Sequence, residues 1–249
     1  MNKILIIGNW KMNLTYTEAE MYIAKIKDLY QQNASVFNDK VSFGIAAPYT
    51  CLPAFRNLKL DNFVLVAQDV SSHLDGSYTG DVSATMLKDL NVSYAIIGHN
   101  ERRAYHKEDN ALINAKAKQL ISNGITPIIC VGEDLHDFES GQTKKVIKQQ
   151  VLESSANLPH DKFVIAYEPV WATGTGKCAS SCQAQEISEY IRSLVGQNCH
   201  ILYGGSVTET NVTKLINKDD IDGFLIGKAS LNVKQFFDIL MEVANNEKQ

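Results

Sequence analysis

The chain has 249 residues, of which 45% are hydrophobic and 21% are charged, as in a globular protein with a sizeable core. Its formal net charge of −4, without a long basic run, argues against a surface that binds nucleic acid or an anionic membrane. The start MNKILIIGNW is too short an apolar segment for a signal peptide, and no run of about 18 apolar residues occurs, so we expect a soluble protein of the cytoplasm.

Cysteine and histidine usage gives no sign of a disulfide framework or a metal site. The five cysteines are odd in number and sparse, which fits reduced thiols. Cys178 and Cys182 lie close in the chain, but no second Cys or His pair nearby completes a tetrahedral zinc site. The six histidines are scattered without ligand spacing, so no metal is expected.

Short apolar runs recur along the whole chain and predict eight strands. They are continuous rather than alternating, as in parallel strands that are covered on both faces. In chain order they are KILIIGNW (3–10), VSFGIAA (41–47), FVLVAQ (63–68), SYAIIG (93–98), TPIICVG (126–132), KFVIAYE (162–168), CHILYGG (199–205) and DGFLIG (222–227).

Between these runs lie segments that predict eight helices. The amphipathic ones are 17–32, 110–124, 146–156, 185–196 and 233–244, and three shorter ones are 52–58, 83–90 and 209–217. Thr17 is the expected N-cap of the first helix, and Gly124 is the expected C-cap of the helix that begins at 110.

Strict alternation of strand and helix predicts a parallel sheet with right-handed crossovers. Eight such units in about 250 residues fit a closed (β/α)₈ barrel, formed as a single domain over residues 1–249. The alternative is an open, doubly wound sheet, whose first turn should carry G-x-G-x-x-G. The first predicted strand instead runs into GNWKMN, and no linker divides the chain.

In such a barrel the carboxyl ends of the strands gather around one mouth, where chemistry takes place. Five of the predicted strand ends matter here because they carry polar or glycine-rich sequence. These are Asn9 to Lys11, His99, Glu168, Gly204 to Ser206, and Gly227 with Lys228. A base, an imidazole and a cation at one mouth are a combination that chance seldom produces.

Five segments resemble the signatures of the triosephosphate isomerase family, in the same order and spacing. They are GNWKMN, IIGHNERR, AYEPVWATGTGK, YGGSV and GFLIGKASL, and the similarity runs from about Asn9 to Leu231. The resemblance implies a (β/α)₈ barrel that interconverts dihydroxyacetone phosphate and D-glyceraldehyde 3-phosphate through an enediolate. It further implies a role in glycolysis and gluconeogenesis, without any cofactor.

The resemblance also implies roles for residues at the mouth. Glu168 is the base, and burial under a lid should raise its basicity. His99 is the electrophile, and a neutral histidine in this role is an established feature of the family. The helical turn that follows should disfavour its protonation. Lys11 supplies positive charge, Asn9 a hydrogen-bond donor, and Glu101 orders this group.

A phosphate site and a lid complete the set that the resemblance implies. Backbone N–H groups should bind the phosphate, a common arrangement after strands seven and eight. They belong to Gly174, Gly205, Ser206, Gly227 and Lys228. The lid should close over the substrate and exclude water from the enediolate. It comprises Pro169, Val170, Trp171, Ala172, Thr173, Gly174, Thr175, Gly176 and Lys177.

The segment 68–84 is long for a loop between a strand and a helix, and such loops are usually functional or disordered. It resembles the arm through which members of the family form a homodimer. Thr79 at its tip would then reach Asn9 and Lys11 of the partner subunit. A mobile surface loop is the alternative.

Four positions depart from the usual family pattern and leave the rate and the lid motion open. Asp69 stands where asparagine is common, Asn100 where serine is, Thr173 where isoleucine is, and Lys228 where glycine is. None of them removes a catalytic group.

Two other functions remain open from the sequence. A different phosphate-binding barrel enzyme, such as a Schiff-base aldolase, would need a lysine where Glu168 stands. A barrel retained only for binding would be expected to have lost Lys11, His99 or Glu168, and all three are present.

Overall fold

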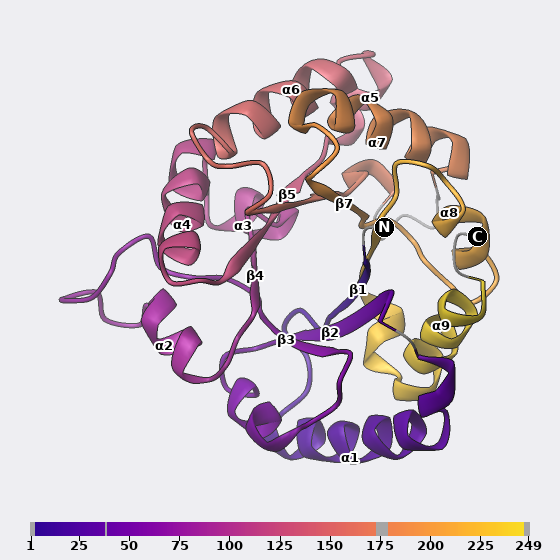
Figure 1. The fold of residues 1–249 in the computed structure, drawn as a ribbon. Coiled ribbons are helices and arrows are strands. Elements are labelled where there is room, and N and C mark those ends of the chain that lie inside the picture. The colour runs from indigo at the N-terminus through magenta and orange to yellow at the C-terminus, as the bar shows by residue number, and fades with distance from the viewer. Residues whose placement is uncertain (1–2, 38, 173–178, 247–249) are drawn as a thin grey trace.

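Eight parallel strands close into a barrel in which neighbours in the chain are neighbours in the sheet (Figure 1). The computed structural model describes residues 3–37, 39–172 and 179–246. The strands are β1 (Ile4–Asn9), β2 (Val41–Ala47), β3 (Phe63–Ala67), β4 (Tyr94–Ile97), β5 (Thr126–Val131), β6 (Val164–Tyr167), β7 (His200–Tyr203) and β8 (Gly223–Ile226). β8 pairs with β1, so the predicted (β/α)₈ barrel is confirmed and the open sheet is wrong.

Helices surround the barrel on its outside (Figure 1). The described α-helices are α1 (Tyr16–Gln32), α2 (Ala84–Asp89), α3 (Asn100–Tyr105), α4 (Asn110–Ser122), α5 (Leu135–Glu139), α6 (Thr143–Ser154), α7 (Ser181–Val195), α8 (Val212–Ile216) and α9 (Val233–Asn245). The 3₁₀-helices within the described ranges are η1 (Ala34–Val36), η2 (Leu52–Asn57), η3 (Val170–Ala172) and η4 (Lys228–Leu231). None of the described helices has the length and apolar character that a membrane crossing requires.

The helix predictions hold with several corrections. α5 was not predicted, the helical turn expected after His99 is the helix α3, and the segment 52–58 forms the 3₁₀-helix η2 rather than an α-helix. The N-cap of α1 is Thr15, not Thr17, because Thr15 and Glu18 form a reciprocal capping box. Gly124 lies one residue beyond the C-cap Asn123 of α4, with a φ of +73° that suits glycine.

Successive strand residues point alternately into the barrel and outward towards the helices. The inward set fills the barrel with apolar side chains, so the barrel is a packed core rather than a channel. Its members are Leu5, Ile7, Ala46, Val66, Ile96, Ile128, Cys130, Val164, Ala166, Leu202 and Leu225. The interior is therefore closed between the two mouths of the barrel, so a site at one mouth is separate from a cavity at the other.

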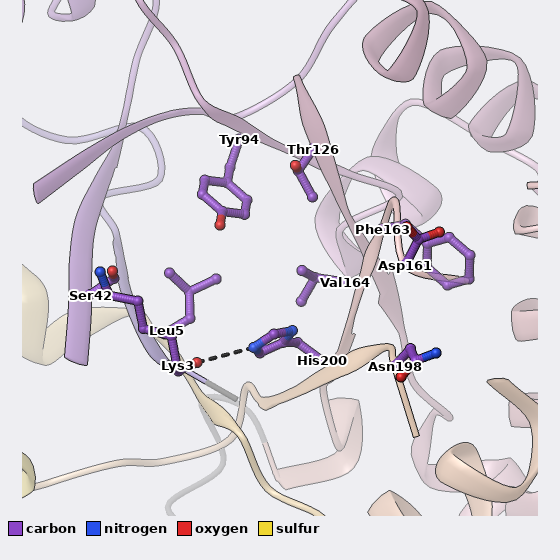
Figure 2. A pocket seen from close by; sticks show the side chains of 10 residues that line it. All are labelled: Lys3, Leu5, Ser42, Tyr94, Thr126, Asp161, Phe163, Val164, Asn198 and His200. Atoms are coloured by element: carbon purple, nitrogen blue, oxygen red, sulfur yellow. Dashed lines mark hydrogen bonds between the residues drawn. The ribbon is translucent and has the colours of Figure 1, made fainter. Parts of the chain in front are cut away.

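The mouth at the amino ends of the strands holds a cavity of about 190 Å³ (Figure 2). Tyr94, Thr126 and His200 point into it, and a ring nitrogen of His200 lies 3.1 Å from the carbonyl oxygen of Lys3. This end of a barrel usually serves stability, whereas catalytic groups stand at the carboxyl ends. The residues of the candidate site lie at the opposite mouth.

Candidate active site

The centre of the site is a contact between a carboxylate and an imidazole. Glu168 directly follows β6, and His99 follows β4 after Gly98. His99 Nε2 lies 2.9 Å from Glu168 Oε1, and the two residues are only 5% and 4% exposed. Two strand ends that are far apart in the sequence thus bring an acid–base pair together in a water-poor place.

Asn100 and the start of α3 fix this pair from one side. The backbone N–H and the side-chain amide of Asn100 both donate to Glu168 Oε2, each at 3.3 Å. His99 is the N-cap of α3, and its Nδ1 accepts the backbone N–H of Glu101 at 3.3 Å. This last bond needs a lone pair on Nδ1, which places the ring proton on Nε2, facing Glu168.

Each member of the pair changes the protonation of the other. Burial alone lowers the pKa of His99, but the Glu168 carboxylate outweighs it and raises that pKa above its ordinary value. Burial alone raises the pKa of Glu168, but His99 and Asn100 outweigh it and lower that pKa. In this substrate-free arrangement both pKa shifts therefore run opposite to the directions expected from burial and from the helix terminus, because each group lies against its partner.

Lys11 joins the pair through Glu101. Its Nζ lies 2.7 Å from Glu101 Oε1, and the other carboxylate oxygen of Glu101 lies 3.4 Å from His99 Nδ1. The backbone N–H of Lys11 donates to Oδ1 of Asn9 at 3.0 Å. Lys11, Asn9, Glu101, His99 and Glu168, all predicted from the sequence, are thus gathered at one mouth.

Glycines after β7 leave space that the base occupies. A Cβ at Gly204 would stand 2.8 Å from Cγ of Glu168, and a Cβ at Gly205 would stand 2.1 Å from the hydroxyl of Tyr203. Gly204 also donates its N–H to the carbonyl of Tyr167 at 2.7 Å, which ties this turn to β6. Any larger residue here would displace Glu168 or Tyr203.

The other predicted phosphate-binding residues border the same mouth. Gly227 directly follows β8, and a Cβ there would lie 3.7 Å from Cε of Lys11, so this strand end faces the lysine stem. Ser206 and Lys228 are exposed, and Lys228 begins η4. Gly174, the fifth predicted residue, lies outside the described residues.

Only the first part of the predicted lid is described. Pro169, Val170, Trp171 and Ala172 leave β6 as a short turn that includes η3, whereas Thr173, Gly174, Thr175, Gly176 and Lys177 lie outside the described residues. Trp171 is 7% exposed and stacks on Phe138 with ring centroids 4.1 Å apart.

Glu133 anchors this segment, and the sequence analysis missed it. Its Oε1 accepts from Trp171 Nε1 at 2.9 Å, from Tyr167 Oη at 3.1 Å and from Thr143 Oγ1 at 3.4 Å. Burial raises the pKa of Glu133 in spite of these donors. Its place in the sequence could have indicated it, because one residue separates Glu133 from the end of β5, just as one residue separates His99 from the end of β4.

Asp69, one of the four departures, belongs to a buried network of charges. Its carboxylate contacts Lys116 Nζ at 2.6 Å and Arg102 at 2.8 Å, and both cations also contact Glu108 at 2.6 Å. Two cations and two carboxylates therefore join the loop after β3 to α3 and α4. Burial raises the pKa of Asp69, with Lys116 opposing this shift.

The remaining predicted positions lie away from this centre. Thr79 is exposed in the loop 68–84, and Cys182 is an exposed free thiol, whereas Cys178 lies outside the described residues. Within the described part of the chain, the one group spaced for a metal ion is Asp134, His136 and Asp137. It is exposed or half-buried at the start of α5 and includes no residue of the site.

Comparisons with known proteins agree with the geometry. A family model described as Triosephosphate isomerase matches residues 4–243. A triosephosphate isomerase of Mycoplasmopsis pulmonis is 46% identical over 242 residues, which cover 96% of this chain and 98% of the relative. Those of Mesomycoplasma hyorhinis and Alkaliphilus oremlandii are 45% and 42% identical, over 96% of this chain and 98% and 99% of theirs. This chain therefore belongs to the triosephosphate isomerase family.

Proposed function

We propose that this protein interconverts dihydroxyacetone phosphate and D-glyceraldehyde 3-phosphate, with Glu168 as the base and His99 as the electrophile. The observation that carries the proposal is the 2.9 Å contact between these two buried side chains at the active mouth of a barrel of this family. A proton must leave a carbon next to a carbonyl, and the enediolate that results must be stabilised. A carboxylate beside an imidazole provides both functions.

Substrate binding has to separate the pair. A hydrogen bond of 2.9 Å leaves no room for a reacting carbon and oxygen between Glu168 and His99, so the carboxylate must move as substrate enters. It then loses contacts that lower its pKa, while burial, the largest influence, continues to raise it. Glu168 therefore becomes a stronger base in the complex than in the free protein.

The same separation changes His99. Without the carboxylate against Nε2, burial and the N–H of Glu101 at Nδ1 both favour the neutral ring. Nε2–H can then donate to the carbonyl oxygen on which negative charge develops. Neutral imidazole in the complex follows from the loss of the Glu168 contact, not from the helix terminus alone.

The other groups hold the anionic parts of the substrate. Lys11 supplies positive charge for the enediolate and the phosphate, with Asn9 as a neighbouring donor and Glu101 to orient the ammonium. Backbone N–H groups of Gly174, Gly205, Ser206, Gly227 and Lys228 bind the phosphate. The segment from Pro169 to Lys177 closes over the substrate, and no cofactor takes part.

A coupled assay with each triose phosphate tests the reaction, with ribulose 5-phosphate as the control substrate. Turnover of both triose phosphates, without turnover of the pentose phosphate, is the expected result. Turnover of ribulose 5-phosphate alone would indicate a different sugar-phosphate isomerase. No turnover of any of them would indicate a barrel that only binds. The proposal also includes a cytoplasmic role in glycolysis and gluconeogenesis.

The pH dependence should differ between the free protein and the complex. The profile of kcat/KM reports the groups of the free protein, and that of kcat reports those of the complex. Because Glu168 raises the pKa of His99 in the free protein, protonated His99 persists above pH 6.5, and kcat/KM should fall as pH decreases through that raised pKa. The corresponding fall of kcat should occur at a lower pH than the fall of kcat/KM, since His99 in the complex has lost the contact with Glu168.

Steady-state kinetics between pH 5 and 9 provide the measurement, and His99→Gln is the control. The substrate phosphate itself titrates near pH 6, so a limb that remains in His99→Gln belongs to another group. If kcat and kcat/KM of the unaltered protein fall at the same pH, the separation of the pair on binding is contradicted.

We further propose a two-fold homodimer joined through the loop 68–84. The exposed tip residue Thr79 would lie in a pocket of the partner subunit, and exposed apolar residues occur on the same loop, namely Leu74 and Tyr78. Such a contact would connect each loop to the opposite active site.

Thr79→Arg should therefore produce a monomer, because an unpaired charge buried in the interface costs several kcal/mol. Lys11 keeps its contacts to Glu101 within its own subunit, so we expect about a tenfold loss of kcat/KM, less than the 10²-fold that a displacement of about 1 Å can cause. Sedimentation velocity measures the assembly. Ser193→Arg, which adds the same charge on the exposed face of α7, should remain a dimer. A fully active Thr79→Arg monomer would contradict the link between the loop and the site.

A further inference from the structure

The side-chain amide of Gln68 points at three oxygen atoms on neighbouring segments. Gln68 directly follows β3, and its Nε2 lies 2.9 Å from the carbonyl of Lys11, 2.8 Å from the carbonyl of Ala46 and 3.4 Å from Oδ1 of Asn9. The amide has two hydrogens, so the two carbonyls are its principal acceptors. The opposite amide orientation would place Oε1 against three oxygens, so the surroundings fix which end faces them.

Lys11, which receives one of these bonds, has an unusual backbone. Its φ is +53°, in the left-handed region that residues other than glycine seldom adopt. Such a conformation persists only where surrounding contacts over-determine it. Here Asn9 Oδ1 accepts the N–H of Lys11 at 3.0 Å and Gln68 donates to its carbonyl, so both polar groups of this residue's backbone are held.

The strained backbone decides where the ammonium lies. From this conformation the stem of Lys11 runs beside Gly227, and Nζ reaches Glu101, which in turn borders His99. With a relaxed backbone at residue 11, the side chain would leave the chain in another direction. The amide of Gln68 also donates to the carbonyl of Ala46, which accepts the N–H of Trp10 at 3.1 Å. The segment that carries Trp10 and Lys11 is therefore held in a fixed position relative to β2.

We infer that Gln68 is a positioning residue for Lys11. Its amide holds the left-handed backbone of Lys11 and thereby aims the ammonium at the mouth where the substrate's phosphate ester binds. The inference rests on the proposed function, since it concerns how that function is achieved. Gln68 acts through Lys11 rather than on the reacting atoms.

A double-mutant cycle separates positioning from a general structural role. Gln68→Met keeps the length of the side chain and removes both donors. In the unaltered background we expect a loss of kcat/KM of about 10- to 100-fold, mostly through a higher KM, because a displacement near 1 Å can cost up to 10²-fold. In the Lys11→Met background the same change should cost less than about threefold, since residues that act as a unit are not additive.

Gln185→Met provides the matched control. Gln185 also uses its amide to hold another segment, through bonds of 2.7 and 3.2 Å to Asp220, and it lies on α7, where its hydrogen bonds within the described residues go to Asp220 rather than to Lys11, His99 or Glu168. Its effect on kcat/KM should stay within about twofold in either background, as expected for independent sites. If Gln68→Met does not fold, Gln68→Glu takes its place in the cycle, because it has the same shape and places an oxygen against the three oxygens.

The outcomes distinguish this inference from the proposed function. If the unaltered protein turns over triose phosphates and the Gln68 variant shows the same loss with and without Lys11, Gln68 does not act through Lys11 and the inference is overturned. Losses confined to the background that retains Lys11 would support it. If the unaltered protein turns over no triose phosphate, the proposed function itself fails, and the inference fails with it.

Discussion

Shortening Glu168 to aspartate should lower kcat by about 10²-fold or more while leaving KM within about threefold, because a displacement near 1 Å of a catalytic group can cost that much. The removed methylene withdraws the carboxylate from the position that the proton transfer needs. The phosphate contacts are made by other residues, so substrate affinity is retained. Steady-state kinetics with either triose phosphate provide the measurement.

Glu108→Asp is the control for shortening a buried carboxylate. Glu108 is 5% exposed, like Glu168, but its contacts are Arg102 and Lys116 rather than His99. It should lower the melting temperature, because it disturbs a buried ion-pair network, yet change kcat by no more than about threefold. A loss in Glu168→Asp of less than about fivefold would mean that Glu168 is not the base.

The barrel could be predicted because its strands carry the information locally. Runs such as ILIIGN in β1 are buried along their whole length, and their spacing leaves room for one helix each. α5 escaped prediction, and α3 was expected only as a helical turn, because five and six residues are too few for an amphipathic repeat to show. They are held by caps, a His99 side chain in one case and an Asp134 side chain in the other.

The sequence predicts which residues of the site follow strands, but not the contacts that their side chains make. His99, Glu168 and Lys11 follow strands in the chain, and closure of the barrel brings them together. The contact between His99 and Glu168 joins residues far apart in sequence, so their opposite pKa shifts could not be read from either neighbourhood. Glu133 and Gln68 also follow strands, but their roles depend on which oxygen or nitrogen their side chains meet, and only the folded chain defines that.

The four departures from the family pattern differ in what the structure explains. Asp69 has two cationic partners, Arg102 and Lys116, so a carboxylate suits this position well. Asn100 supplies a side-chain donor to Glu168 in addition to its backbone N–H. The effect of Asn100 on rate depends on how readily Glu168 leaves these resting contacts when substrate binds.

Replacing Lys11 by methionine should have an even larger effect than shortening the base. Two unit charges about 4 Å apart interact by roughly 4 kcal/mol at an effective dielectric constant of about 20, which corresponds to about 10³-fold in kcat/KM. Both kcat and KM should change, because the charge acts on the bound phosphate and on the enediolate that develops later. Methionine keeps the stem and leaves the backbone bonds to Asn9 and Gln68 available.

Folding should tolerate this change, which keeps the kinetic result interpretable. The only charged partner recorded for Nζ among the described residues is Glu101, whose side chain is 41% exposed, so its carboxylate remains solvated when the ammonium is removed. A melting temperature close to that of the unaltered protein is therefore expected. A large drop would instead indicate that Lys11 is chiefly structural.

Lys228→Met is the matched control, since it removes a second lysine charge from the same mouth. Lys228 is exposed, and an ammonium about 8 Å from the phosphate in water-like surroundings gains only roughly 0.5 kcal/mol. Its loss should raise KM by at most about threefold, and the effect should fade with salt. The Lys11→Met defect should persist at high salt, because the charge lies close to the bound substrate and is screened less. Unchanged KM and turnover in Lys11→Met would show that this lysine takes no part in the active site. Equal defects in the two variants would show that net charge at the mouth, rather than the position of Lys11, governs binding.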